Sequence, residues 1–336
     1  MGGANKNANK NERGKGRGEK DAGNIINFSD FSGINQAAGM DDADEVDREV
    51  EALLDQAYES EDEAEIARLV DRVLELRPDD PEALLLRADL TEDDGERLSI
   101  LTGALDAVRT VLKQHGVEEE EYVEDALGLV YLALLQRMAF TLFAVGDDDA
   151  ALQAVEELLR HDLEGDDSAK NLYYRILTER AEWSRILAEA MRDTNHQPGW
   201  AYSRLAAAFM LARDARGRAT AAQMFWDALL MGPDIPFYML GYLPEPEDEA
   251  EDADFNFAML YADVWSTSRE LLNWFSRGVI LFGLLSGRFG EERDGMLEIL
   301  DSLGGREEFD RMCAVIRDSD DTAIIETLAA HHCLAE

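Results

Sequence analysis

Apolar residues recur at spacings of three and four from residue 43 almost to the end of the chain. The first to do so are Val46, Val50, Leu53, Leu54 and Ala57. This spacing gathers apolar side chains on one face of an α-helix. No segment shows the alternation of a half-buried strand, and no hairpin turn joins two such segments. The pattern therefore predicts an all-α chain.

Short polar breaks divide this pattern into pieces of helical length. They lie at residues 61–62, 77–81, 116, 146–148, 165–168, 197–199 and 216–217. Each break contains Gly, Pro, Asp or Ser, which end or cap helices. Beyond residue 254 the same reasoning predicts helices at about 255–264, 268–286, 291–302, 305–317 and 321–332.

The helical segments also show a repeat. Residues 64–81 read AEIARLVDRVLELRPDDP, which matches the second helix of a tetratricopeptide repeat and the turn that follows it. A further unit places Leu135 and Ala139 on a first helix, Gly146 in the turn and Ala151 on a second helix. We therefore expect an α-solenoid of tetratricopeptide-like antiparallel helix pairs, in which each repeat packs on its neighbours.

A turn in the second half of the chain carries a family resemblance. Its matching residues are Pro233, Ile235, Pro236, Tyr238, Leu240 and Gly241, followed by Tyr261, Ala262, Trp265, Leu271 and Trp274. On these residues, the stretch 166–276 resembles the suppressor-of-tumorigenicity type of tetratricopeptide-like proteins and their uncharacterised bacterial relatives. The family's Asn in this turn is Gly232 here. The resemblance implies a helical repeat fold and no reaction.

Composition divides the chain into four parts. Residues 1–40 form a basic arm with an apolar island at 25–34, and the first 23 residues are too polar to bury a core. Residues 41–244 hold the repeats. Residues 245–254 read EPEDEAEDAD, which is typical of an exposed acidic linker or loop. Residues 255–336 are expected to extend or cap the solenoid. The island either docks on its own chain or serves as a motif for a partner.

The net charge of −40 comes from 72 acidic and 32 basic residues. Such a charge repels nucleic acid and anionic lipid, and it suits a basic partner or simply keeps the protein soluble. Two cysteines, Cys313 and Cys333, give no disulfide framework, so we expect a cytoplasmic protein. The apolar segment 127–145 contains Gln136 and Arg137, which argues against a membrane span.

Tests for catalytic and metal chemistry are negative. Four residues, Asp252, Asp254, Asn256 and Asp263, fall at calcium-loop spacing, but Phe257 stands where the loop needs glycine. No nucleophile elbow, phosphate loop or dinucleotide fingerprint is present. We therefore predict no catalytic residue, no cofactor and no metal, and a protein that is not an enzyme.

Two features near the end of the chain contain residue types found in metal or thiol sites. The run from His331 through His332 to Cys333 lacks the spacing of a zinc site and is interpreted as a frayed tail. Cys313 is interpreted as a small core residue of an amphipathic helix.

Aromatic residues crowd the middle of the chain, and most are expected to pack between helices. Some could line the concave groove, where aromatic rings and Arg serve as anchors. Six in the best-matched repeats are the candidate partner-binding residues: Tyr173, Tyr174, Arg175, Tyr202, Arg204 and Tyr238. The leading hypothesis is an adaptor or scaffold that binds a peptide or helix in a repeat groove. The alternatives are an acidic decoy or chaperone for a basic or nucleic-acid-binding protein, and an enzyme whose site the sequence hides.

Overall fold

The computed structural model describes residues 43–161, 167–194, 196–246, 249–317 and 320–335. The basic arm and its apolar island lie outside the described residues. Within the described ranges the chain forms sixteen α-helices and short 3₁₀ turns, with no strand. The predicted all-α class is therefore confirmed.

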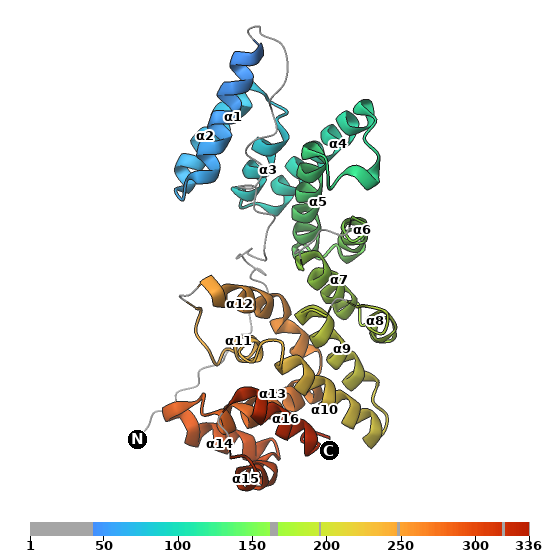
Figure 1. Ribbon diagram of the computed structural model, residues 1–336, viewed down its shortest axis with the longest axis vertical. Helices are drawn as coiled ribbons and strands as arrows, with labels where there is room; N and C mark the ends of the chain where they lie inside the picture. The colour runs from blue at the N-terminus through green and yellow to red at the C-terminus, as the bar shows by residue number, and fades with distance from the viewer. Residues whose placement is uncertain (1–42, 162–166, 195, 247–248, 318–319, 336) are drawn as a thin grey trace, which may run out of the picture.

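The helices follow one another with short connections (Figure 1). The first ten are α1 (Ala43–Glu59), α2 (Glu63–Leu76), α3 (Pro81–Asp89), α4 (Asp94–His115), α5 (Ala126–Ala144), α6 (Asp148–Leu158), α7 (Ser168–Glu179), α8 (Trp183–Ala190), α9 (Pro198–Leu211) and α10 (Ala215–Leu229). The remainder are α11 (Ile235–Met239), α12 (Glu249–Tyr261), α13 (Arg269–Ser286), α14 (Arg293–Ser302), α15 (Arg306–Val315) and α16 (Asp321–Ala330), with a 3₁₀ segment at Ala262–Thr267.

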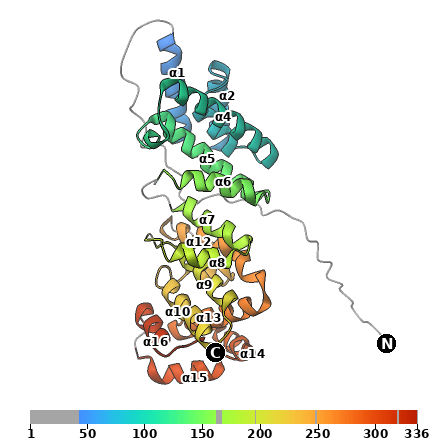
Figure 2. The same cartoon turned by 90° about the vertical axis from the view of Figure 1, so that its right-hand side faces the viewer.

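Consecutive helices pack against each other, from α1–α2 at one end to α9–α10 near the other. The result is an elongated molecule, as Figures 1 and 2 show from two sides. Several departures from neighbour packing occur in the second half, and two of them join distant parts of the chain. The helix α12 returns to α7, and α16 packs on α10 and α13.

Many of the abundant aspartates cap helices. Asp62, Asp93, Asp125 and Asp147 each accept a hydrogen bond from a backbone N–H in the first turn of the helix that follows. These N–H groups have no partner within the helix, and the helix dipole favours a negative charge there. Part of the acidic excess therefore has a local structural role.

Two helix starts differ from the prediction. The helix expected from about residue 255 begins at Glu249, so helix extends into the acidic segment 245–254. The break expected at residues 216–217 lies inside the first turn of α10, because Asp214 caps that helix through the N–H of Gly217. At the second place the cap formed by Asp214 outweighs the local composition.

Among the described helices, α5 is long and apolar enough to cross a bilayer by length and composition. The core helix of a soluble protein passes the same test, and 61% of the apolar window of α5 is buried inside the molecule. The two adjacent polar residues near its middle, Gln136 and Arg137, are satisfied within the fold. Gln136 donates to Ser168 Oγ at 2.6 Å, and Arg137 pairs with Asp89 at 3.2 Å.

The last residues are anchored, so the frayed-tail interpretation was wrong. Cys333 and Leu334 are fully buried. The indole N–H of Trp226 donates to the carbonyl of Cys333, and that of Trp274 donates to the carbonyl of Leu334, both at 3.1 Å. Burial raises the pKa of the Cys333 thiol to about 12. The expectation for Cys313 was also wrong, because this cysteine is exposed.

Candidate functional site

The helix α12 lies on a face built by α7, α9 and α11. Among the side chains of α12 that the structure describes, Phe257, Ala258 and Tyr261 are buried, and they share one side of the helix. Met259, on another side, is exposed. A face predicted to receive a partner's peptide or helix thus holds a helix of the same chain.

Arg175 fastens α7 to the end of α12. Its Nε donates to the carbonyl of Leu260 at 2.8 Å, across 85 residues of sequence. Its Nη1 lies 2.8 Å from Glu179, and its guanidinium carbon lies 5.2 Å from the ring centre of Phe143. Only 2% of the Arg175 side chain is exposed. A buried guanidinium needs partners of this kind, because an unpaired charge in the interior is strongly destabilising.

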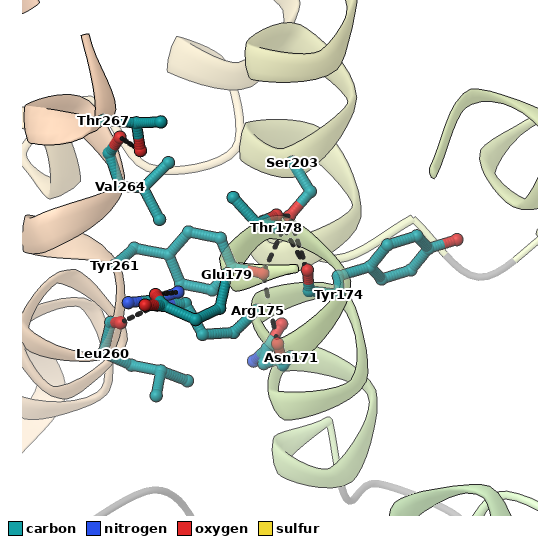
Figure 3. A network of polar contacts seen from close by, with 10 residues as sticks. All are labelled: Asn171, Tyr174, Arg175, Thr178, Glu179, Ser203, Leu260, Tyr261, Val264 and Thr267. Atoms are coloured by element: carbon teal, nitrogen blue, oxygen red, sulfur yellow. Dashed lines mark hydrogen bonds and ion pairs between the residues drawn. The ribbon is translucent and has the colours of Figure 1, made fainter. Parts of the chain in front are cut away.

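A network of polar side chains continues this contact, as Figure 3 shows. The Tyr261 hydroxyl donates to the carbonyl of Asn171 on α7 at 3.1 Å and lies 2.9 Å from Ser203 Oγ on α9. Thr178 donates to the carbonyl of Tyr174 at 2.8 Å, one turn earlier in α7. Burial raises the pKa of Tyr261. The network joins three helices at one buried point.

Aromatic contacts complete the face. The rings of Tyr202 and Phe257 are 5.7 Å apart between centres, and those of Tyr238 and Phe255 are 5.6 Å apart in an edge-to-face arrangement. Both tyrosines are buried. The Tyr202 hydroxyl has no hydrogen-bond partner among the described residues, and burial raises its pKa well above the ordinary range.

Three of the six candidate residues, Arg175, Tyr202 and Tyr238, therefore meet at α12. The side chains of the other three make their contacts elsewhere, although the carbonyl of Tyr174 belongs to the network.

Tyr173 accepts a hydrogen bond from Arg185 of α8 at 3.0 Å. Tyr174 is buried and donates to Asp193 at 3.0 Å. Arg204 lies with its guanidinium carbon 3.8 Å from the ring centre of Trp200. A direct partner contact by any of the six stays a prediction, and for the buried ones it requires that the covering segment move.

The polar groups at this face are poorly placed for catalysis. Ser203 on α9 and Tyr261 at the end of α12 are fully buried where the two helices meet, so a substrate would not reach them while α12 is docked. Within the described part of the chain, neither hydrogen-bonds to a histidine or a carboxylate that could act as a base. Their geometry serves to position helices.

Comparison of the chain with protein-family models, with curated proteins and with solved structures found no match. The function is therefore inferred from the fold and the contacts described above.

Sequence reasoning missed two parts of this site. It did not place Ser203 or Asn171, because a small polar residue on an apolar helix carries no signal that a distant tyrosine will bond to it. It did single out Tyr261 within the family-like pattern. The position of that tyrosine at the end of an acidic, aromatic helix was the available clue to a return contact.

Replacing Tyr261 by phenylalanine is expected to lower the free energy of unfolding by about 1–2 kcal/mol. The substitution removes a buried hydroxyl and leaves the Asn171 carbonyl without that donor. Urea unfolding followed by circular dichroism measures the change. Tyr242→Phe is the matched control, because burial alone raises the pKa of its hydroxyl, without a hydrogen bond to a described residue. Equal effects of the two substitutions would contradict the assigned role of Tyr261.

Proposed function

We propose that this protein is an adaptor that binds other proteins through a helix-receiving face formed by α7, α9 and α11. The observation that carries the proposal is the resident helix α12, held by Arg175, Tyr202, Ser203 and Tyr238. Grooves that bind helices recognise apolar side chains spaced along one helical side. The buried side of α12 provides such side chains in Phe257, Ala258 and Tyr261.

The proposal includes the architecture that supports such a face. Helices α1 to α10 would form a solenoid of tetratricopeptide-like pairs, in keeping with the neighbour-to-neighbour packing. The suppressor-of-tumorigenicity resemblance over residues 166–276 fits this architecture and remains part of the proposal. A cytoplasmic location is also proposed, since Cys313 and Cys333 are both free thiols.

A partner helix has to compete with α12. Because α12 is joined covalently to the face, its effective concentration there is of the order of millimolar. A partner therefore binds strongly only if its own contacts are better than those of α12, or if α12 is weakened. This competition makes the proposal testable with single substitutions in α12.

A pull-down from the native lysate tests the proposal, with the full chain, a Phe257→Ala variant and a Met259→Ala control as baits. Phe257 is buried on the face and Met259 is 45% exposed on the same helix. We expect one dominant protein, recovered severalfold more by the Phe257→Ala bait. A peptide of residues 249–261 should release it, because both would occupy one face.

Charge favours the second candidate function, an acidic decoy or chaperone for a basic or nucleic-acid-binding protein. The net charge of −40 is the supporting observation. Attraction between exposed charges is screened by salt, whereas apolar docking is not. The decoy function would be supported if all three baits recover the partner protein equally at low salt and lose it at high salt. If no bait recovers a protein at either salt concentration, stable partner binding is contradicted and a hidden enzyme site becomes the better hypothesis.

A further inference from the structure

The N-terminal hairpin α1–α2 has a hydrophobic core separate from that of the rest of the molecule. Its buried members are Val50, Leu54, Val70, Val73 and Ala83. The first four come from the hairpin itself and Ala83 from α3. The main core runs without interruption from α3 to the last residues of the chain. So small a core holds its elements weakly, and segments of this kind open more readily than the whole protein unfolds.

Tyr58, near the end of α1, connects the two cores. Among the described residues it is the one partly buried side chain that packs against both. Its hydroxyl lies 3.5 Å from Glu82 Oε2 in the first turn of α3. Glu82 is half-buried at this joint and forms no ion pair with a described residue. Docking of the hairpin therefore partly buries the carboxyl group of Glu82 at a position where no cation of the described residues pairs with it.

The charged groups around the joint are mostly acidic. They come from the elements packed there: Glu51 and Asp55 on α1, Asp71 on α2, Asp80 at the turn before α3, Asp89 at the end of α3, and Arg77, Arg87 and Arg137 as the cations. All three cations are already engaged. Arg87 of α3 pairs with Asp71 of α2 across the joint. Arg77 pairs with Asp47 and lies 3.8 Å from Asp80, and Arg137 pairs with Asp89.

We propose that protonation of Glu82 controls how tightly the α1–α2 hairpin docks on α3. With Glu82 protonated, its carboxyl group fits beside Tyr58 and the neighbouring carboxylates without repulsion. With Glu82 ionised, the buried negative charge faces other carboxylates, and the hairpin opens more often. Opening would expose the apolar side chains of the small core, including Leu54 and Val70, to solvent or to another molecule.

The direction of the pH effect follows from the geometry. Burial, then repulsion by Asp80, raises the pKa of Glu82 from its ordinary 4.5 to about 7 in the docked state. The docked state therefore binds the proton more tightly than the open state. Docking is strongest below about pH 4.5 and weakens as the pH rises through about 7. Between pH 5 and pH 8 the ratio of open to docked hairpin should rise by more than about tenfold.

Hydrogen exchange of the intact chain, read by mass spectrometry on peptides from α1 and α2, measures this opening. Rates at pH 5, 6, 7 and 8 are corrected for the intrinsic pH dependence of amide exchange. We expect the corrected opening of α1–α2 to rise more than about tenfold in the wild type. Peptides from α9 and α10, in the main core, should show no such rise.

Two variants decide whether Glu82 is responsible. Glu82→Gln keeps the shape and removes the titration, so most of the pH dependence in α1–α2 should disappear. Glu92→Gln makes the same chemical change at an exposed position after α3 and should leave the wild-type response intact. A full pH response in Glu82→Gln, or a response below about twofold in the wild type, would overturn the proposal.

Discussion

Substitution of Arg175 by methionine should lower the free energy of unfolding by about 3 kcal/mol. The buried guanidinium donates to the Leu260 carbonyl and pairs with Glu179, and methionine can replace neither contact. Removing one partner of a buried ion pair commonly lowers the free energy of unfolding by about 3–5 kcal/mol. Here Glu179 can regain water, since 35% of its side chain is exposed, so the lower end of this range is expected. Denaturant unfolding of both proteins gives the difference.

The matched control is Arg192→Met. Arg192 is exposed just after α8, and a surface substitution of this kind usually changes stability by less than about 0.5 kcal/mol. The Arg175 variant should also show faster hydrogen exchange in α12. A loss below about 1 kcal/mol for Arg175→Met would contradict the role of Arg175 and would mean that the Tyr261 hydrogen bonds and the aromatic contacts hold α12.

Substitution of Leu334 by alanine is the second large expected effect, with a loss of about 3 kcal/mol. The Leu334 side chain is fully buried and packs on α13 at Gly278, so truncation leaves a cavity. A Cβ added at Gly278 would come within 2.6 Å of Leu334 Cδ1 and of Phe225 Cζ. Gly278→Ala alone should therefore also destabilise, by about 1–3 kcal/mol.

The two substitutions should not be additive. Leu334→Ala removes one of the atoms that a new Cβ at residue 278 would strike, so the double variant should lose less than the sum. The control is Leu159→Ala, since Leu159 is 38% exposed at the end of α6 and should change stability by less than about 1 kcal/mol. Full additivity would show that the tail does not contact α13 as described.

Most helices could be predicted from the sequence because their information is local. The breaks at residues 61–62, 77–81 and 146–148 hold capping aspartates, prolines or glycine, and helices begin or end there in the structure. The start of α10 was missed although its signal is equally local. At Asp214 a cap before the break set the start of α10.

The site itself was only partly predictable. Arg175, Tyr202 and Tyr238 were predicted to bind a partner; the structure places them in contact with α12 of the same chain, and partner binding by them stays a prediction. The occupant was not predictable, because nothing local to α7 or α9 states that residues 255–261 return to them. The same limit applied to Cys333, whose burial depends on Trp226, 107 residues away.

Binding of a purified peptide of residues 249–261 tests the central claim, that the face of α7, α9 and α11 binds a helix. Binding is measured to the wild-type chain and to a chain that carries Phe257→Ala and Tyr261→Phe. These two substitutions weaken the contacts that hold the chain's own α12 on the face. The account predicts that the weakened chain binds the peptide at least about tenfold more tightly than the wild type does, because the resident helix competes less. A peptide with Phe257→Ala should not bind. Equal binding to both chains, or none to the weakened chain in its folded state, would contradict the account.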